Sequence, residues 1–198
     1  DKTGTLTCNV MKFFCCSVGD VVYGMDGKAE SAHEQGGYVR ACSPHVEYDP
    51  SCHFVDRRCF DDMVSTSAAN AAQLRDFWTL LAVCHTVVPS EKNGKIAYEA
   101  ESPNEAALVD AARWMGFEFC RRSLGSVFVL NKNPPGGGPA VEEEYQVLNV
   151  NEFNSTRKRM SVALRCPDGR VRLFVKGADN VIMERLKGGK GGGRPGDA

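Results

Sequence analysis

Hydrophobic and polar residues follow two different periods along the chain, and the longest helical pattern covers about residues 68–84. Four apolar residues there fall at i, i+3, i+4 and i+7: Leu74, Phe77, Trp78 and Leu81. Residues with that spacing share one helical face. The Val-Val-Pro run that follows contains a residue that cannot continue a helix. We therefore predict an amphipathic helix that buries one side.

A second helix is predicted to begin at Ser102, because Pro103 takes the first helical position and Glu105 the third. A serine at the N-cap with a glutamate three residues later is the pattern of a capping box. Its apolar face consists of Leu108, Ala111, Ala112 and Met115. Gly116 is expected to close the helix.

Shorter apolar runs predict strands over residues 18–23, 95–98, 145–150, 159–165 and 171–176. The last two are joined by Cys-Pro-Asp-Gly, and an Asp-Gly step between strands indicates a hairpin. A short helix over 179–186 is predicted to follow. The helices and strands together give mixed α/β content. Because the strands are joined by hairpins and not by repeated βαβ units, we expect an α+β fold, with a twisted antiparallel sheet flanked by helices.

Three stretches carry little periodicity. Residues 24–62 predict loops with one or two short strands. Residues 133–140, followed by Glu142–Glu144, predict a flexible acidic loop inserted between elements. The glycine-rich tail 187–198 is expected to be flexible.

Composition limits the class of protein. A chain of 198 residues can hold one ordinary domain, and a hydrophobic fraction of 42% argues against wholesale disorder. The net charge of -1 gives no electrostatic reason to expect a nucleic-acid partner. No run of about 18 apolar residues is present, so no segment is predicted to span a bilayer. Since the chain starts at Asp1 without a methionine, we expect a piece of something longer.

The nine cysteines and four histidines form no metal-binding spacing. Cys15 and Cys16 are adjacent, and the chain contains no CxxC pair. The sequence therefore predicts thiols in a reducing compartment and no metal bound by these residues.

The first candidate for chemistry is Asp1. A carboxylate can attack a phosphoryl group and form an acyl phosphate. Lys2 could neutralise phosphate charge, and the turn that starts at Thr3 offers backbone N–H groups and hydroxyls. A surface loop can contain the same residues, so chemistry alone leaves both interpretations open.

Three further candidates lie far apart in the chain. Phe153 precedes a basic run, and an aromatic ring beside cations can stack on a nucleobase; a packed phenylalanine beside a solvated turn is the alternative. Lys176 ends a predicted strand and could reach a nucleotide or lie at a solvated edge. Glu105 could equally serve the capping box alone.

The order of four segments distinguishes these alternatives. DKTGTLT resembles the phosphorylation motif of the P-type ATPases, and SPNEAALV, EFNSTRKRMSV and FVKGAD follow it in that family's order. The resemblance implies that Asp1 becomes the aspartyl phosphate, and that Lys2 and Thr3 hold the transferred phosphate. It also implies that Asp1 and Thr3 bind Mg²⁺, and that this segment has a haloacid-dehalogenase-like fold.

The same resemblance implies an ATP site. By it, Phe153 stacks on adenine, Glu105 faces the adenine end and Lys176 lies beside the nucleotide. The isolated chain is then expected to bind nucleotide without turnover, because many partner motifs of the family are missing from it.

The implied domain organisation has three parts. Residues 1–12 begin the phosphorylation domain, residues 13–186 form the nucleotide-binding domain, and residues 187–198 form the tail. The Tyr-Glu-Ala-Glu before the second segment and the Glu-Phe-Asn form of the third look like the phospholipid-flippase branch. That branch implies a phospholipid substrate, an accessory membrane subunit in some cases, and a multi-pass membrane protein whose corresponding segment is cytosolic.

Three alternatives stay open at this point. A cation-transporting P-type ATPase would share the four segments. A haloacid-dehalogenase-like phosphatase usually has a second aspartate two residues after the nucleophile, where this chain has Thr3. A non-catalytic nucleotide-binding module would keep the pocket alone. A P-loop ATPase is excluded, because no GxxxxGK[ST] motif occurs.

Overall fold

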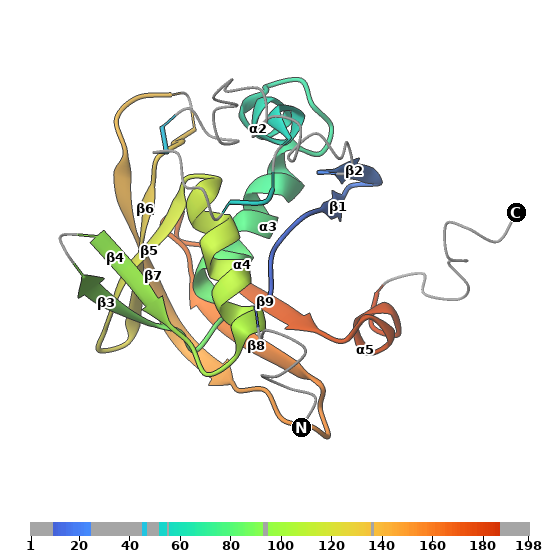
Figure 1. Cartoon of the computed structure of the whole chain (residues 1–198), viewed down its shortest axis with the longest axis vertical. Coiled ribbons are helices and arrows are strands. Elements are labelled where there is room, and N and C mark those ends of the chain that lie inside the picture. The colour runs from blue at the N-terminus through green and yellow to red at the C-terminus, as the bar shows by residue number, and fades with distance from the viewer. Residues whose placement is uncertain are drawn as a thin grey trace, which may run out of the picture.

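The computed structural model describes residues 10–24, 45–46, 52–54, 56–92, 95–135 and 137–186. Its elements in chain order are β1 (Cys16–Val18), β2 (Val21–Tyr23), α2 (Arg57–Val64), α3 (Ala71–Val83), β3 (Val88–Lys92), β4 (Lys95–Glu99), α4 (Pro103–Trp114), β5 (Phe117–Ser123), β6 (Ser126–Asn131), β7 (Val141–Asn151), β8 (Arg159–Arg165), β9 (Val171–Gly177) and α5 (Asp179–Met183). Figure 1 shows how they are arranged. None of the helices in these ranges is long and apolar enough to cross a bilayer.

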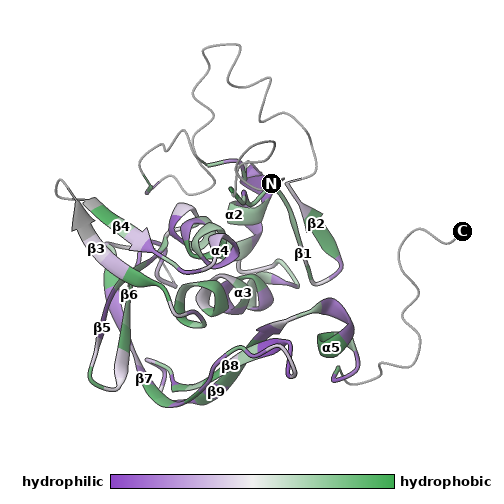
Figure 2. Cartoon of the chain, turned by 60° about the horizontal axis from the view of Figure 1, so that its bottom comes forward, coloured by the Kyte–Doolittle hydropathy of each residue, from purple (hydrophilic) through white to green (hydrophobic). Residues whose placement is uncertain are grey.

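The main sheet has five strands in the order β5-β6-β7-β8-β9, and every neighbouring pair is antiparallel. The sheet curves, and α3 and α4 lie on its concave side (Figure 2). The predicted α+β fold with an antiparallel sheet and packed helices is therefore confirmed. The pairs β1–β2 and β3–β4 form two small separate hairpins.

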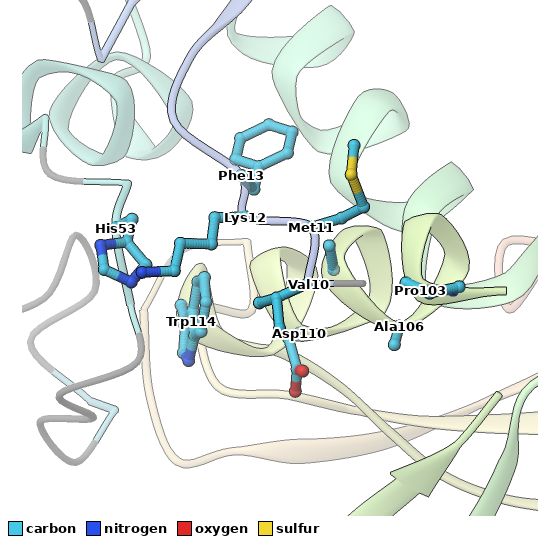
Figure 3. A pocket seen from close by; sticks show the side chains of 10 residues that line it. Val10, Met11, Lys12, Phe13, His53, Pro103, Ala106, Asp110 and Trp114 are labelled. Atoms are coloured by element: carbon cyan, nitrogen blue, oxygen red, sulfur yellow. The ribbon is translucent and has the colours of Figure 1, made fainter. Parts of the chain in front are cut away.

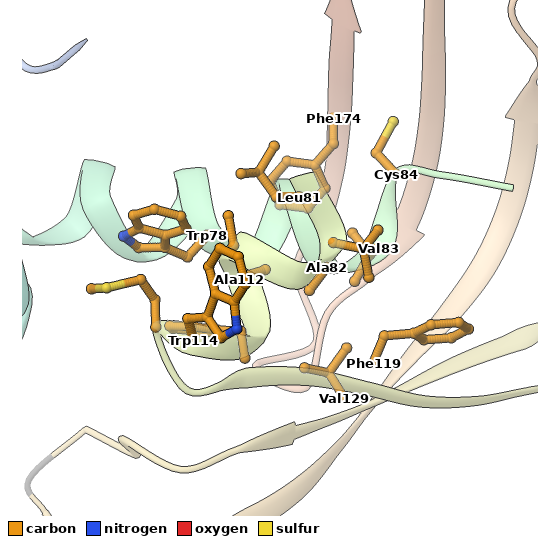
Figure 4. Packing of buried hydrophobic residues seen from close by; sticks show 14 of the residues in the cluster. Trp78, Leu81, Ala82, Val83, Cys84, Ala112, Trp114, Phe119, Val129 and Phe174 are labelled. Carbon is orange, nitrogen blue, oxygen red and sulfur yellow. The ribbon is translucent and has the colours of Figure 1, made fainter. Parts of the chain in front are cut away.

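The core lies between the two long helices and the sheet. The predicted apolar face of α3 is confirmed, since Leu74, Trp78 and Leu81 are buried and Phe77 packs against them. Figure 4 shows the α3 residues meeting Ala112 and Trp114 of α4 above Phe119 and Val129 of the sheet. Burial of these large side chains is the main source of stability for the fold.

Two three-residue strands replace the single strand predicted over 18–23. The chain reverses at Gly19 and Asp20, whose φ angles are +59° and +63°. Positive φ at both central residues is the geometry of a type I′ hairpin turn. The Gly-Asp step was the signal for this turn within the apolar run.

Helix α2 occupies part of the stretch predicted as loops and short strands. Asp56 caps it by accepting the N–H of Arg58 at 3.0 Å, and it also accepts the N–H of Gly24 at 2.9 Å. Phe60 and Met63 bury one side of the helix. A helix of eight residues presents too few apolar positions for its period to be read in the sequence.

The sheet also differs from prediction around β5, β6 and β7. Strands β5 and β6 were not predicted, and the acidic run assigned to an inserted loop belongs to β7. Each of its carboxylates has a partner on another strand of the sheet. Glu143 accepts from Asn131 of β6 at 2.9 Å, Glu144 from Ser126 of β6 at 2.7 Å, and Glu142 from Arg121 of β5, one strand further on, at 2.7 Å. These partners allow three consecutive acidic residues to occupy a strand.

Two predictions fall on residues that the structure does not describe. The DKTGTLT segment and the tail 187–198 both lie outside the described ranges. Within the described ranges, the strand predicted at 95–98 pairs with β3 to form a hairpin. The last helix ends at Met183, earlier than the predicted residue 186.

Candidate functional site

A pocket of about 590 Å³ lies where the start of α4, the end of β9 and the β7–β8 connection meet. Glu105, Phe153 and Lys176 all line it. These residues were predicted from three separate segments, and the fold brings them to one cavity. The remaining lining residues are Thr86, Glu101, Ser102, Asn104, Leu108, Glu152, Met160 and Gly177.

Glu105 points into this pocket rather than back to its own helix. Lys176 Nζ donates to Glu105 Oε1 at 2.7 Å, and Thr86 Oγ1 donates to Oε2 at 2.7 Å. Ser102 has N-cap dihedrals, but its side chain makes no capping hydrogen bond. The predicted capping box is therefore wrong, because a charged donor and a hydroxyl engage the carboxylate instead.

The Glu105–Lys176 pair is largely shielded from solvent, with side chains 16% and 20% exposed. Burial by itself would raise the pKa of Glu105, but hydrogen bonds from Lys176 and Thr86, together with the Lys176 charge, lower it overall. Glu105 is consequently ionised at neutral pH and offers the pocket hydrogen-bond acceptors only.

Phe153 presents its ring at the pocket with 62% of the residue exposed. The connection that carries it is held by hydrogen bonds within the turn. Asn154 accepts the N–H of Arg157 at 2.7 Å through its side chain and the N–H of Lys158 at 2.8 Å through its carbonyl. Arg157 also donates to the Glu152 carbonyl at 3.0 Å. A large aromatic ring on a fixed turn and open to solvent is suited to stack on a planar ligand.

Gly177 allows two strands to approach closely at the pocket. It pairs with Arg159 across the β8–β9 ladder. A Cβ at this position would lie 2.5 Å from Arg159 Cβ and 2.6 Å from the Lys158 carbonyl oxygen. Any side chain would push apart the strand ends that carry Lys176 and the turn of Phe153.

The segment after α3 lines the pocket through Thr86, and the two residues before it, Cys84 and His85, are buried. Burial raises the pKa of the Cys84 thiol to about 11. Burial, with the nearby Arg122 charge, lowers the pKa of His85 to about 3. His85 is therefore neutral, and its Nδ1 accepts the N–H of Val87 at 3.2 Å.

Sequence reasoning missed Thr86. The preceding Cys-His pair was considered only as a possible metal ligand, and a threonine after a helix end has no pattern of its own. The structure places its hydroxyl at the wall of the pocket, in contact with Glu105.

The described residues also line two further hollows. One of about 510 Å³ is lined by Glu99, Glu101 and Glu152 and borders the first pocket. Among the described residues, no group of three or more His, Cys, Asp or Glu could hold a metal ion. The other, of about 290 Å³, lies between residues 10–13 and the face of α4 that carries Trp114 (Figure 3). Of the predicted site residues that the structure describes, none lines this hollow.

The residues predicted to bind the phosphate and Mg²⁺ are a separate case. Asp1, Lys2 and Thr3, and with them the proposed Mg²⁺ ligands, lie outside the described residues.

Comparison with known proteins finds a matching family and several relatives of this chain. Residues 73–188 match the family model described as P-type ATPase, cytoplasmic domain N. The chain is 44% identical to probable phospholipid-transporting ATPase 12 of Arabidopsis thaliana, over 94% of the chain and 17% of that protein. It is 42% identical to phospholipid-transporting ATPase DRS2 of Saccharomyces cerevisiae, over 94% of the chain and 13% of that protein.

A vertebrate protein gives the same result. Phospholipid-transporting ATPase IC of Xenopus tropicalis is 39% identical over 94% of the chain and 14% of its own length. The chain thus spans only a small part, between 13% and 17%, of these relatives.

Proposed function

Since this chain belongs to the P-type ATPases and contains their cytoplasmic domain N, we propose that the pocket between α4, β9 and the β7–β8 connection binds ATP. The observation that carries the proposal is the meeting of Glu105, Phe153 and Lys176 in one cavity. Three residues chosen from distant segments would not be expected to converge by chance.

The pocket's chemistry suits an adenine nucleotide. The exposed ring of Phe153 can stack on the base, and such stacking is worth roughly 1–3 kcal/mol. The ionised Glu105 can accept a hydrogen bond from the exocyclic amine of adenine, and Lys176 adds positive charge beside the ligand. Glu101 and Glu152 line both this pocket and the adjoining hollow, which Glu99 also lines. These carboxylates would repel the phosphates from the side that the two cavities share.

For the whole protein, the proposal is an ATP-driven phospholipid translocase. Its support is that the relatives reported above carry the name phospholipid-transporting ATPase. In this proposal residues 1–12 begin the phosphorylation domain, and residues 13–186 are the nucleotide-binding domain. The whole protein would lie in a membrane with this part on the cytosolic side, and an accessory membrane subunit is a further possible partner.

The proposed reaction begins with attack of an Asp1 carboxylate oxygen on the γ-phosphoryl group of ATP. An aspartyl phosphate forms and ADP leaves. Lys2 and Thr3 hold the transferred group, and Asp1 and Thr3 are the proposed ligands of Mg²⁺. The metal supplies charge neutralisation at the phosphoryl oxygens. Domain closure must bring the pocket toward Asp1 for this step.

Calorimetric titration of the 198-residue chain with ATP tests the nucleotide site. We expect saturable binding without hydrolysis. Absence of binding to a chain that is folded by circular dichroism would overturn the proposal. In the full-length protein, ATP should label Asp1 with a hydroxylamine-labile phosphate, and Asp1→Asn should abolish the label, because an amide cannot serve as that nucleophile.

A further inference from the structure

Thr86 makes two contacts with the residue that faces the base in the proposed site. Its hydroxyl donates to Glu105 Oε2 at 2.7 Å, and its backbone N–H donates to the same oxygen at 3.3 Å. Lys176 donates to the other oxygen at 2.7 Å. The carboxylate is therefore held from both ends, by groups on the α3–β3 connection and on β9.

The segment that carries Thr86 is itself fixed. Its neighbours His85 and Val87 are each only 1% exposed. His85 bonds the Ala82 carbonyl at 2.8 Å through Nε2, and Arg122 donates to the His85 carbonyl at 2.7 Å. The hydroxyl of Thr86 is consequently presented to Glu105 from a backbone anchored on both sides, so its position is determined before any ligand binds.

An ionised carboxylate has about four acceptor positions and no donor. Thr86 and Lys176 together supply three donors to Glu105, which leaves room for about one more. The exocyclic N–H of a 6-amino purine can satisfy that position. In a 6-oxo purine a carbonyl oxygen takes the place of the amine and the N–H donor of that edge moves to N1, so the base must shift before a carboxylate held in place can accept it. A fixed carboxylate thus discriminates between 6-amino and 6-oxo purines, and a rotating one would do so less well.

We propose that Thr86 is a positioning residue, which holds the Glu105 carboxylate in the orientation that selects 6-amino over 6-oxo purine nucleotides. The inference rests on the proposed nucleotide site. Thr86 acts through Glu105, so its removal should change which base binds more than it changes the stability of the chain.

The test compares the affinities of ATP and inosine triphosphate, in which a carbonyl replaces the amine. We expect the wild-type chain to bind ATP at least about tenfold more tightly than inosine triphosphate. This ratio of Kd values corresponds to the free energy of one hydrogen bond to a charged group. Thr86→Val keeps the shape and removes the hydroxyl, so the preference should shrink by about threefold or more. Thr86→Ser should restore it to within about twofold.

Two further variants make the result specific. Thr66→Val removes the same hydroxyl in the α2–α3 connection, outside the pocket, and should leave both affinities unchanged. Glu105→Gln should nearly abolish the preference, and adding Thr86→Val to it should change the preference no further, because Thr86 acts through that carboxylate.

The measurements test the role of Thr86 separately from the existence of the nucleotide site. An equal loss of ATP and inosine triphosphate affinity in Thr86→Val, or an unchanged preference, would overturn the role of Thr86 while leaving the nucleotide site standing. If folded wild-type chain binds neither nucleotide, the proposed function fails and the inference fails with it.

Discussion

Lys176 and Glu105 form a 2.7 Å ion pair between β9 and α4, although 71 residues separate them in the chain. The pair joins the edge of the sheet to the first turn of the helix, at the floor of the proposed site. Both side chains are mostly shielded from solvent. Removing one partner would leave the other charge partly buried without compensation, which costs more than the loss of a surface pair.

Acid should weaken this link in a defined pH range. The folded state lowers the pKa of Glu105 below the ordinary value of 4.5. A carboxyl with a lowered pKa stabilises the fold above that ordinary value, and the contribution is lost as pH falls through the folded pKa. The difference in free energy of unfolding between wild type and Glu105→Gln should therefore be full near pH 6 and shrink below about pH 4.5. Urea titrations across pH would reveal it, and a difference independent of pH would contradict the pairing.

Replacing Lys176 should impair nucleotide binding more than a matched replacement elsewhere. Lys132 and Glu118 form a pair at 2.8 Å with side chains 20% and 16% exposed, the same exposures as Lys176 and Glu105. Lys176→Met should weaken ATP binding roughly tenfold or more, whereas Lys132→Met should leave it unchanged. Similar affinity losses in both variants would indicate a general effect of losing a lysine.

The ring of Phe153 should contribute to affinity and little to stability. Phe153→Ala should weaken ATP binding roughly 5- to 150-fold, the range expected for one stacked base. Phe153→Trp should retain binding, because an aromatic face remains. Because the residue is 62% exposed, the melting temperature should change little in either variant.

Phe117 provides the opposite control. It is only 3% exposed and lies outside the pocket. Phe117→Leu should lower the free energy of unfolding by about 1 kcal/mol or more and leave ATP affinity unchanged. Calorimetry together with thermal unfolding would separate the two effects, and unchanged affinity in folded Phe153→Ala would place the base elsewhere.

Gly177 and Gly169 restrict substitution for different reasons, and replacement by asparagine should separate the two. Gly169 has a φ of +77° with nothing within 4 Å of an added Cβ, a conformation that asparagine tolerates. At Gly177 an added Cβ would meet backbone and side-chain atoms of the neighbouring strand at 2.5–2.8 Å. Gly169→Asn should be nearly neutral, whereas Gly177→Asn and Gly177→Ala should destabilise by about 1–3 kcal/mol in denaturant unfolding.

Some parts of the fold were visible in the sequence because one side of an element is buried. Leu74 and Trp78 recur at helical spacing, since α3 has one face in the core. Strand β5 carried no such signal. It has a bulge between Phe119 and Arg121, and it turns Arg122 toward the buried His85. A bulge interrupts the period of two, and a charged residue among apolar ones hides the strand.

The site was predicted from the order of motifs rather than from periodicity. That order selected Glu105, Phe153 and Lys176 as candidates, and all three line one pocket. The local capping-box pattern, by contrast, gave Glu105 the wrong hydrogen-bond partners, because Lys176 is distant in the chain. Thr86 had no local pattern and could be recognised only through its contact with Glu105.

The order of strands in the main sheet has a consequence for how this chain folds. Each strand pairs with its neighbour in sequence, so most sheet contacts close short loops. Such local topologies fold quickly, and contacts between distant segments are the entropically costly ones. The contact between Glu105 and Lys176 is of the distant kind, and it exists only once α4 and β9 are both in place. A nucleotide that needs both residues would bind the completed fold alone, and at a hundred times its Kd it would add about 2.7 kcal/mol to stability. Bound ATP would then stabilise against unfolding the same domain that presents ATP to the proposed phosphorylation step.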